Sequence, residues 1–203
     1  ARAKVAAIRS LERLGVTVVP VAVDVADPRA AAAALSPAAL ALPPIRGVVH
    51  AAGVVDNRMI RALDEASLRA VLRPKVDGAL VLDALFPPGS VDFFVLFSSC
   101  GQLLGLPGQG GYAAANAFLD ALALRRRAAG DAGALSLGWT SWRGLGMATS
   151  SAAIAEELAA RGTGDITAVE AFAAWELAAR HGPAYAAVLR VLDHDGPRPA
   201  LLG

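Results

Sequence analysis

VDFFVLF, at residues 91–97, is an almost continuous apolar run that ends in the polar residues Ser98 and Ser99. A short apolar run closed by polar residues is typical of a strand that is buried on both faces of a parallel sheet. Similar β-rich runs occur at residues 16–23, 45–50, 135–139 and 185–191. The sequence therefore predicts a sheet of mostly buried, parallel strands.

Helical patterns separate these runs. They cover residues 2–14, 65–86, 112–127 and 168–180. A further helix is expected after Asp27 and Pro28, because Asp is a good N-cap and Pro a good first helical residue. Pro74 should bend or interrupt the helix at residues 65–86. Strands alternating with helices predict a doubly wound α/β fold, with helices on both faces of the sheet.

Composition narrows the class of protein. The chain has 203 residues, of which 55% are hydrophobic and 18% charged, so it is long enough for one core and too apolar to be disordered. Its net charge of +1 argues against nucleic-acid binding. The single cysteine, Cys100, favours a reducing compartment. No apolar run reaches the roughly 20 residues that span a bilayer, and no signal peptide is recognisable, so we expect a cytoplasmic domain without membrane contact.

Two segments depart from the alternation of strands and helices. Residues 143–166 are rich in Gly, Ser and Thr around a short apolar helix, which suggests a lid over a site. Residues 193–203 are rich in Pro and Gly and suggest an interdomain linker. An ordinary loop and a frayed end are the alternative interpretations of the same composition.

Polar residues follow the predicted strands, at the edge where open parallel sheets bind ligands. Ser99 ends the strand at 91–97, and Tyr112 and Asn116 are spaced to share one face of the next helix. A hydroxyl, a phenol and an amide at one sheet edge suit the polarisation and protonation of a carbonyl oxygen. A hydrolase triad is not indicated, because no G-x-S-x-G motif surrounds Ser99. A metal site is not indicated either, because the three histidines lack ligand spacing.

Lys75, in the segment RPKVDG, is the candidate for lowering the pKa of Tyr112 by favouring the phenolate. The alternative is an ordinary solvated lysine. His50 is better interpreted as a strand-end residue held by the fold than as a catalytic base, and Cys100 as small buried filler beside the site.

Several motifs resemble the ketoreductase domain of modular type I polyketide synthases, a branch of the short-chain dehydrogenase/reductase superfamily. They are HAAGVVDN, RPKVDGA, FFVLFSSCGQLLGLPGQGGYAAANAFLDALA and GWTSWRGLGMA. The resemblance runs from about residue 5 to residue 192. Most of the superfamily has Tyr-x-x-x-Lys, whereas this chain has Tyr112 with Asn116 and a lysine, Lys75, on the preceding helix. This exchange of Lys and Asn is the pattern of the polyketide branch.

The resemblance implies a Rossmann-like fold and NADPH-dependent reduction of a β-keto group carried on an acyl carrier protein. It implies that Tyr112 donates a proton to the keto oxygen, that Ser99 hydrogen-bonds this oxygen, that Lys75 lowers the tyrosine pKa and holds the ribose, and that Asn116 orders a relay water. The residues that it assigns to the cofactor are Asp24, Val25, Ala51, Ala52, Gly53, Lys75, Thr140 and Ser141. Those that it assigns to the substrate are Asn57, Leu104, Gln109, Trp142 and Met147.

The amino terminus departs from the family pattern. Such domains open with a strand, a Gly-rich turn, a helix and a second strand, whereas this sequence begins in the following helix. We therefore expect an N-terminally incomplete fold, with residues 1–192 as a catalytic subdomain that needs the missing segment as a partner. The run at 16–23 is then expected to lack a neighbouring strand, and the chain alone is expected not to bind NADPH.

The stereochemical motifs favour B-type reduction to a D-configured hydroxyl. The loop that carries an L-D-D motif in B-type relatives reads Val55-Asp56-Asn57, and the position of the A-type Trp holds Leu104. Two other functions compete with this interpretation. One is a catalytically silent scaffold packed between neighbouring polyketide synthase domains, and the other is a free-standing reductase of a small ketone or sugar.

Overall fold

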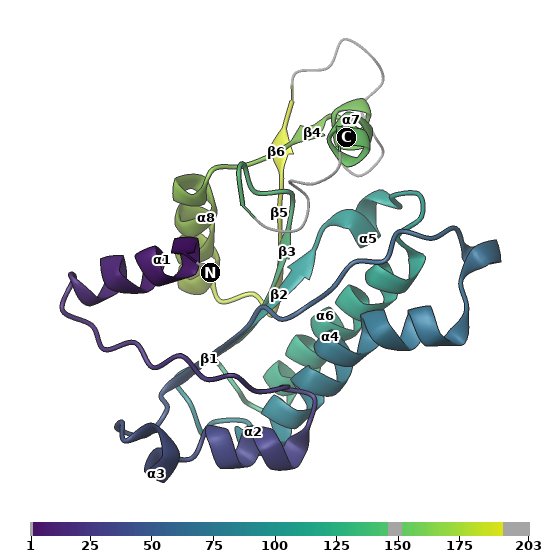
Figure 1. Cartoon of the computed structure of the whole chain (residues 1–203). Coiled ribbons are helices and arrows are strands. Elements are labelled where there is room, and N and C mark those ends of the chain that lie inside the picture. Colours follow the sequence, from purple (N-terminus) through teal and green to yellow (C-terminus); the bar gives the residue numbers. More distant parts are fainter. Residues whose placement is uncertain (1, 146–151, 193–203) are drawn as a thin grey trace.

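The computed structural model describes residues 2–145 and 152–192, built around one parallel sheet (Figure 1). Its four strands lie in the order β1-β2-β3-β5, and every neighbouring pair is parallel. In chain order the elements are α1 (Arg2–Glu12), α2 (Pro28–Ala34), α3 (Pro37–Leu40), β1 (Gly47–His50), η1 (Ile60–Ala62), α4 (Glu65–Leu85), β2 (Phe93–Ser99), α5 (Gly101–Leu104), α6 (Gly110–Ala128), β3 (Ala134–Trp139), α7 (Ala152–Ala160), β4 (Thr163–Gly164), α8 (Ala168–His181), β5 (Tyr185–Val188) and β6 (Arg190–Val191). The predicted doubly wound α/β class is confirmed.

The first five residues of β2, Phe93 to Phe97, are apolar because side chains on both faces of this strand pack against helices. Phe94 and Leu96 point into a core with α4 and α6, whereas Val95 belongs to a second core on the opposite face, which α8 covers. Alternate side chains of a strand point to opposite faces of the sheet. Phe94, Val95 and Leu96 are therefore all buried, whereas Phe93 at the start of β2 is 44% exposed.

Two helices begin at well-defined capping residues, of which Asp27 was predicted from the sequence. Asp27 caps α2 by accepting hydrogen bonds from the N–H groups of Arg29 and Ala30, and Pro28 is its first residue. Thr167 and Glu170 form a capping box at the start of α8. Pro74 does not interrupt α4, which continues from Glu65 to Leu85.

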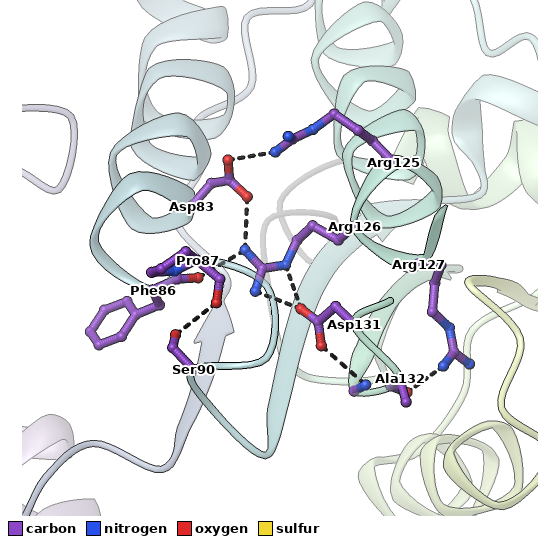
Figure 2. Close-up of polar contacts among 10 residues, drawn as sticks. Asp83, Phe86, Pro87, Ser90, Arg125, Arg126, Arg127, Asp131 and Ala132 are labelled. Atoms are coloured by element: carbon purple, nitrogen blue, oxygen red, sulfur yellow. Dashed lines mark hydrogen bonds and ion pairs between the residues drawn. The ribbon is translucent and has the colours of Figure 1, made fainter. Parts of the chain in front are cut away.

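A buried charge network ties the helices to the sheet at the end away from the strand carboxyl termini (Figure 2). The fully buried Arg126 of α6 pairs with Asp83 of α4 at 2.7 Å and with Asp131, just before β3, at 2.6 Å. Its guanidinium also donates to the carbonyl oxygen of Phe86 and lies 3.8 Å from the centroid of the Phe94 ring. One side chain thus joins α4, α6, β2 and the start of β3.

The prediction of a strand at residues 16–23 is wrong, because this segment has no regular secondary structure. Val16, Val19 and Val21 are 41–50% exposed, and the segment pairs with no strand in the described part of the chain. A β-rich sequence becomes a strand only where a neighbour supplies its hydrogen bonds. The single strand expected at 185–191 is also divided, because β5 pairs with β3 whereas β6 pairs with β4.

The region predicted as a lid contains α7, β4 and Ile166, whereas residues 146–151 lie outside the described residues. Leu158 of α7 packs against Cys100 and Leu104, and Arg161 donates to the carbonyl oxygen of Leu104. The end of α7 therefore contacts α5 and its N-cap residue Cys100. Residues 193–203, the predicted linker, also lie outside the described residues. No helix within the described ranges is long and apolar enough to cross a bilayer.

Candidate active site

A cavity of about 490 Å³ opens at the carboxyl ends of β1, β2 and β3. This is the edge at which open α/β sheets bind their ligands. Its lining comes from the strand ends, the loops that follow them, and helices α4, α5, α6 and α7. The lining residues are Ala51, Gly53, Val55, Asn57, Lys75, Phe97, Ser98, Ser99, Cys100, Gly101, Leu106, Gln109, Tyr112, Trp139, Thr140, Ser141, Trp142, Leu145 and Leu158.

Lys75 reaches the cavity from the middle of α4 and is only 2% exposed. Its Nζ donates to the carbonyl oxygen of Phe97 at 2.8 Å and lies 5.5 Å from the centroid of the Tyr112 ring. A Cβ atom on Gly53 would come within 2.9 Å of the Lys75 Cε. Gly53 therefore packs directly against the lysine, and its lack of a side chain leaves room for Lys75.

Ser99 and Tyr112 approach the cavity from different elements. Ser99 ends β2, and its Oγ accepts a hydrogen bond from the Gly101 N–H at 3.1 Å. This contact leaves the hydroxyl hydrogen free to donate toward the cavity. Tyr112 lies in the first turn of α6. Asn116, one turn later, is completely buried behind it, and its Nδ2 donates to the Tyr112 carbonyl oxygen at 2.8 Å.

Burial dominates the acid–base properties of the site. It lowers the pKa of Lys75 to about 8, while the negative charge of Asp120 opposes this shift. Burial also raises the pKa of Tyr112, and a hydrogen bond with Asn116 opposes that shift. The pKa of Tyr112 is therefore raised, whereas the sequence predicted that Lys75 would lower it. Burial removes the hydration of the phenolate, and this cost outweighs the stabilising contacts nearby. The phenol is therefore protonated at neutral pH and able to act as a proton donor.

His50 lies at the end of β1 and holds α4 in place. It is 3% exposed, and its Nε2 lies 3.3 Å from the carbonyl oxygen of Lys75, which identifies Nε2 as the protonated nitrogen. A Cβ on Gly78 would lie 3.2 Å from the imidazole Cε1, so glycine permits this close approach. His50 does not line the cavity. The geometry agrees with its interpretation as a residue held by the fold.

His50 is expected to make the stability of the protein depend on pH. Burial lowers its pKa from 6.5 to about 4, so below pH 6.5 the unfolded chain binds a proton that the folded chain does not. The free energy of unfolding should therefore fall as the pH decreases through this window, with a full contribution of about 3 kcal/mol. Denaturant titrations of the protein and of His50→Asn should show a smaller pH dependence in the variant between pH 6.5 and about 4.5. Equal slopes in the two proteins would contradict the assignment.

The cavity brings together most of the residues that the sequence points to. Ten of the predicted site residues line it: Ala51, Gly53, Asn57, Lys75, Ser99, Gln109, Tyr112, Thr140, Ser141 and Trp142. Gln109 Nε2 lies 3.4 Å from Asn57 Oδ1, so two of the predicted substrate residues contact each other. Asn116 supports Tyr112 from behind.

Besides Asn116, four of the described residues that were predicted for the site do not line the cavity. Asp24 is exposed and paired with Arg73 at 2.7 Å, and the neighbouring Val25 packs against the core formed with α4. Ala52 belongs to the turn but does not line the cavity, and Leu104 is buried against Cys100 and Leu158. Met147 lies outside the described residues.

The cavity also contains residues that sequence patterns do not single out. They are the apolar and aromatic residues Phe97, Leu106, Trp139, Leu145 and Leu158, together with Gly101. Val55, Ser98 and Cys100, which are named above for their places in the sequence, line the cavity as well. Alternation along β2 places Phe97 on the α8 face, where its ring lies 5.4 Å from Trp139 and 6.4 Å from Trp142. Apolar walls of this kind are ordinary for ligand pockets. Their hydrophobicity alone does not distinguish them from core residues.

A family model described as the KR domain matches residues 1–144. Among curated proteins, the 6-methylsalicylic acid synthase of Aspergillus terreus is 51% identical over 193 residues, which covers 95% of this chain and 11% of that protein. The 5-methyl-1-naphthoate synthase of Streptomyces sahachiroi is 48% identical over 197 residues, covering 96% of this chain and 11% of the relative. The chain thus spans about 11% of the length of these relatives.

Solved structures show the same relationship. An A1-type ketoreductase superposes with a TM-score of 0.85 at 36% identity, covering 95% of this chain and 40% of that structure. The first ketoreductase of the tylosin polyketide synthase superposes with a TM-score of 0.82 at 40% identity, covering 94% and 41% of the two chains. The shared fold includes the parallel sheet at whose edge the cavity lies.

Proposed function

The chain belongs to the KR domain family, the ketoreductases of polyketide synthases, and on this premise we propose that it reduces the β-keto group of a polyketide intermediate to a hydroxyl with NADPH. The observation that carries the proposal is the convergence of Lys75, Ser99 and Tyr112 on one cavity. An ammonium, a hydroxyl and a protonated phenol are the groups that carbonyl reduction needs around the oxygen.

Three groups around the cavity suit the nicotinamide-ribose end of the cofactor. The hydroxyls of Thr140 and Ser141 and the ammonium of Lys75 match the amide and ribose hydroxyls as hydrogen-bond partners. The Ala51-Ala52-Gly53 turn would lie against the same end, and Asp24 and Val25 would contact the adenine end. When bound, NADPH supplies the hydride.

The reaction requires the protein to move one proton and to stabilise developing negative charge. Tyr112 donates its phenol proton to the keto oxygen, and Ser99 donates a hydrogen bond to the same oxygen. Lys75, 5.5 Å from the centroid of the Tyr112 ring, stabilises the phenolate that this proton transfer leaves. Asn116 holds the start of α6 through the Tyr112 carbonyl, and we assign to its side-chain oxygen a water of the proton relay.

The substrate is proposed to arrive on an acyl carrier protein, with the domain among other polyketide synthase domains. The relatives support this proposal, because the matched region is a small part of each synthase. We further propose B-type reduction, to a D-configured hydroxyl. Position 104, where the resemblance places the Trp of A-type relatives, holds Leu in this chain. Chiral analysis of the reduced thioester would contradict the B-type assignment if the L product formed.

Reduction of a β-ketoacyl thioester by the full-length native polypeptide tests the proposal. NADPH-dependent formation of the hydroxyacyl product is expected, and Ser99→Ala should lower kcat about 10²-fold, because one donor to the developing oxyanion is lost. Ser90→Ala is the matched control, since Ser90 lies in an exposed turn where its hydroxyl donates to the Pro87 carbonyl. Folded protein that binds NADPH without forming product would instead support the scaffold alternative.

A further inference from the structure

The short helix α5 holds the hydroxyl of Ser99 through its first residue, Gly101. The Gly101 N–H donates to the Ser99 Oγ at 3.1 Å. Gly101 has no side chain at this point, where a Cβ atom would lie 3.3 Å from the same Oγ. A serine side chain has three staggered positions, and the Gly101 N–H favours the one in which Oγ accepts its hydrogen bond. The location of α5 therefore decides where the Ser99 hydroxyl points.

Helix α5 is too short to be stable by itself. It has four residues and ends at Gly105, which has a φ of 62°. A single helical turn fixes many backbone dihedral angles for few hydrogen bonds, so it needs contacts with the rest of the fold. One contact lies at its end, where Leu104 packs against Leu158 of α7. The start of the turn, which carries Gly101, needs a second contact.

Asp120 of α6 supplies this second contact. Its Oδ2 accepts a hydrogen bond from the side-chain amide of Gln102 in α5, and its Oδ1 accepts one from the Ser136 hydroxyl of β3 at 2.6 Å. Ser136 is fully buried, so the carboxyl group connects α5 to the interior of the sheet. The Oε1 atom of Gln102 is buried and accepts no hydrogen bond within the described ranges. The contact with Asp120 is therefore what fixes this amide.

Helix α6 has contacts of its own with the sheet. The Ser98 hydroxyl of β2 donates to the Asn116 carbonyl at 3.3 Å, and the Asn116 side chain donates to the Tyr112 carbonyl at 2.8 Å. These two hydrogen bonds hold the start of α6 against the end of β2. Loss of the contact between Gln102 and Asp120 should therefore release α5 and leave Tyr112 in place.

We propose that Gln102 and Asp120 are positioning residues, whose contact anchors α5 and thereby directs the Ser99 hydroxyl toward the keto oxygen. The catalytic consequence rests on the proposed function, in which Ser99 and Tyr112 act on one oxygen. Neither Gln102 nor Asp120 lines the cavity, so both act through Ser99 and not on the substrate. A displacement of about 1 Å at a reacting group costs up to about 10²-fold in rate, which makes this anchoring important.

Hydrogen–deuterium exchange of the full-length native polypeptide tests the anchoring without turnover. Gln102→Leu removes the amide and nearly keeps the size of the side chain. The N–H groups of Leu104 and Gly105 donate within α5, to the carbonyls of Cys100 and Gly101. They should exchange about 3- to 10-fold faster in the variant, because one hydrogen bond that opposes local opening is lost. Unchanged exchange in α5 would overturn the proposal.

Leu103→Gln is the matched control for the exchange experiment. Leu103 is the next residue of α5, is 39% exposed and does not line the cavity. Its substitution is the reverse replacement in the same helix, and it retains the contact between Gln102 and Asp120. Exchange in α5 should therefore stay as in the unmodified protein. Equal acceleration in Leu103→Gln and Gln102→Leu would show that any change in this helix loosens it, and the proposal would fail.

A double-mutant cycle with Ser99→Ala tests how the anchoring reaches catalysis. Gln102→Leu alone should lower kcat by about 10-fold and leave KM and NADPH affinity unchanged, because the cavity lining is intact. In the Ser99→Ala background, Gln102→Leu should lower kcat by less than about twofold, since no hydroxyl remains to be directed. Equal losses of kcat in the two backgrounds would show that Gln102 does not act through Ser99 and would overturn the proposal.

An exchange of the two side-chain groups provides the rescue. Gln102→Glu removes the N–H donor and places two carboxyl groups against each other, so it should lower kcat as Gln102→Leu does. Adding Asp120→Asn returns an N–H donor from the opposite side, while the new amide oxygen still accepts from Ser136. The double variant should recover most of the lost kcat. A double variant as slow as Gln102→Glu alone would contradict the proposal.

The outcomes separate this proposal from the proposed function. Exchange is measured without substrate, so it decides whether Gln102 and Asp120 anchor α5 even if the unmodified polypeptide forms no hydroxyacyl product. Absence of that product would instead refute the proposed reduction. Gln102→Leu also removes a buried atom that has no hydrogen bond within the described ranges, so its urea midpoint should stay close to that of the unmodified protein. If Gln102→Leu does not fold, Gln102→Glu replaces it in both experiments.

Discussion

Tyr112→Phe should lower kcat for reduction of a β-ketoacyl thioester by about 10²–10⁴-fold, which is the size of effect expected when a general acid is removed. The substitution deletes one hydroxyl from the cavity wall and leaves the ring beside Lys75. The proton then has to come from water, which is not held at the keto oxygen. Turnover measured by loss of NADPH absorbance checks this expectation.

Binding measurements give the control for Tyr112→Phe. The helix start is held by the Asn116 contact with the backbone carbonyl of residue 112, which the substitution retains. Stability and NADPH affinity should therefore stay close to those of the unmodified protein, and the loss should appear in kcat and not in cofactor binding. A variant that retained more than about a tenth of the original kcat would exclude Tyr112 as the general acid.

Arg126→Met should lower the free energy of unfolding by about 3–5 kcal/mol, since removing one partner of a buried ion pair leaves the other charges unpaired. Figure 2 shows the guanidinium between Asp83 and Asp131, and the side chains of Arg126 and Asp131 are 0% and 2% exposed. The substitution would also remove the stacking on Phe94 and the hydrogen bond to Phe86. Equilibrium denaturation in urea measures the loss.

Arg125→Met is the matched control, one residue away on the same helix. Arg125 also pairs with Asp83, but its side chain is 56% exposed, so its removal should cost less than about 1 kcal/mol. Equal losses in the two variants would contradict the view that burial makes the Arg126 network critical. Because the network lies at the opposite end of the sheet from the cavity, the prediction concerns stability and does not depend on the proposed function.

Local sequence patterns predicted the strand–helix alternation and much of the cavity. The apolar run that precedes Ser98 and Ser99 specified β2, because the middle of this strand is buried on both faces and needs apolar residues on each. The spacing of Tyr112 and Asn116 placed both on one helix face, since the period of a helix is a local property. The same spacing continues to Asp120, but the spacing alone does not show that Ser136 and Gln102 would hold its carboxylate.

The features that depend on contacts between residues far apart in the sequence were determined only by the tertiary structure. The β-rich run at 16–23 is no strand here, because β propensity cannot replace the hydrogen bonds of a neighbouring strand. Burial, which no local pattern reports, raised the pKa of Tyr112 where a nearby lysine alone predicted a lowering. The hydrogen bond from Lys75 to the Phe97 carbonyl likewise arises from the packing of α4 against β2. Residue type and spacing thus indicated which chemical groups lie at the candidate site, whereas packing determined the pKa values of these groups and the contacts that they make.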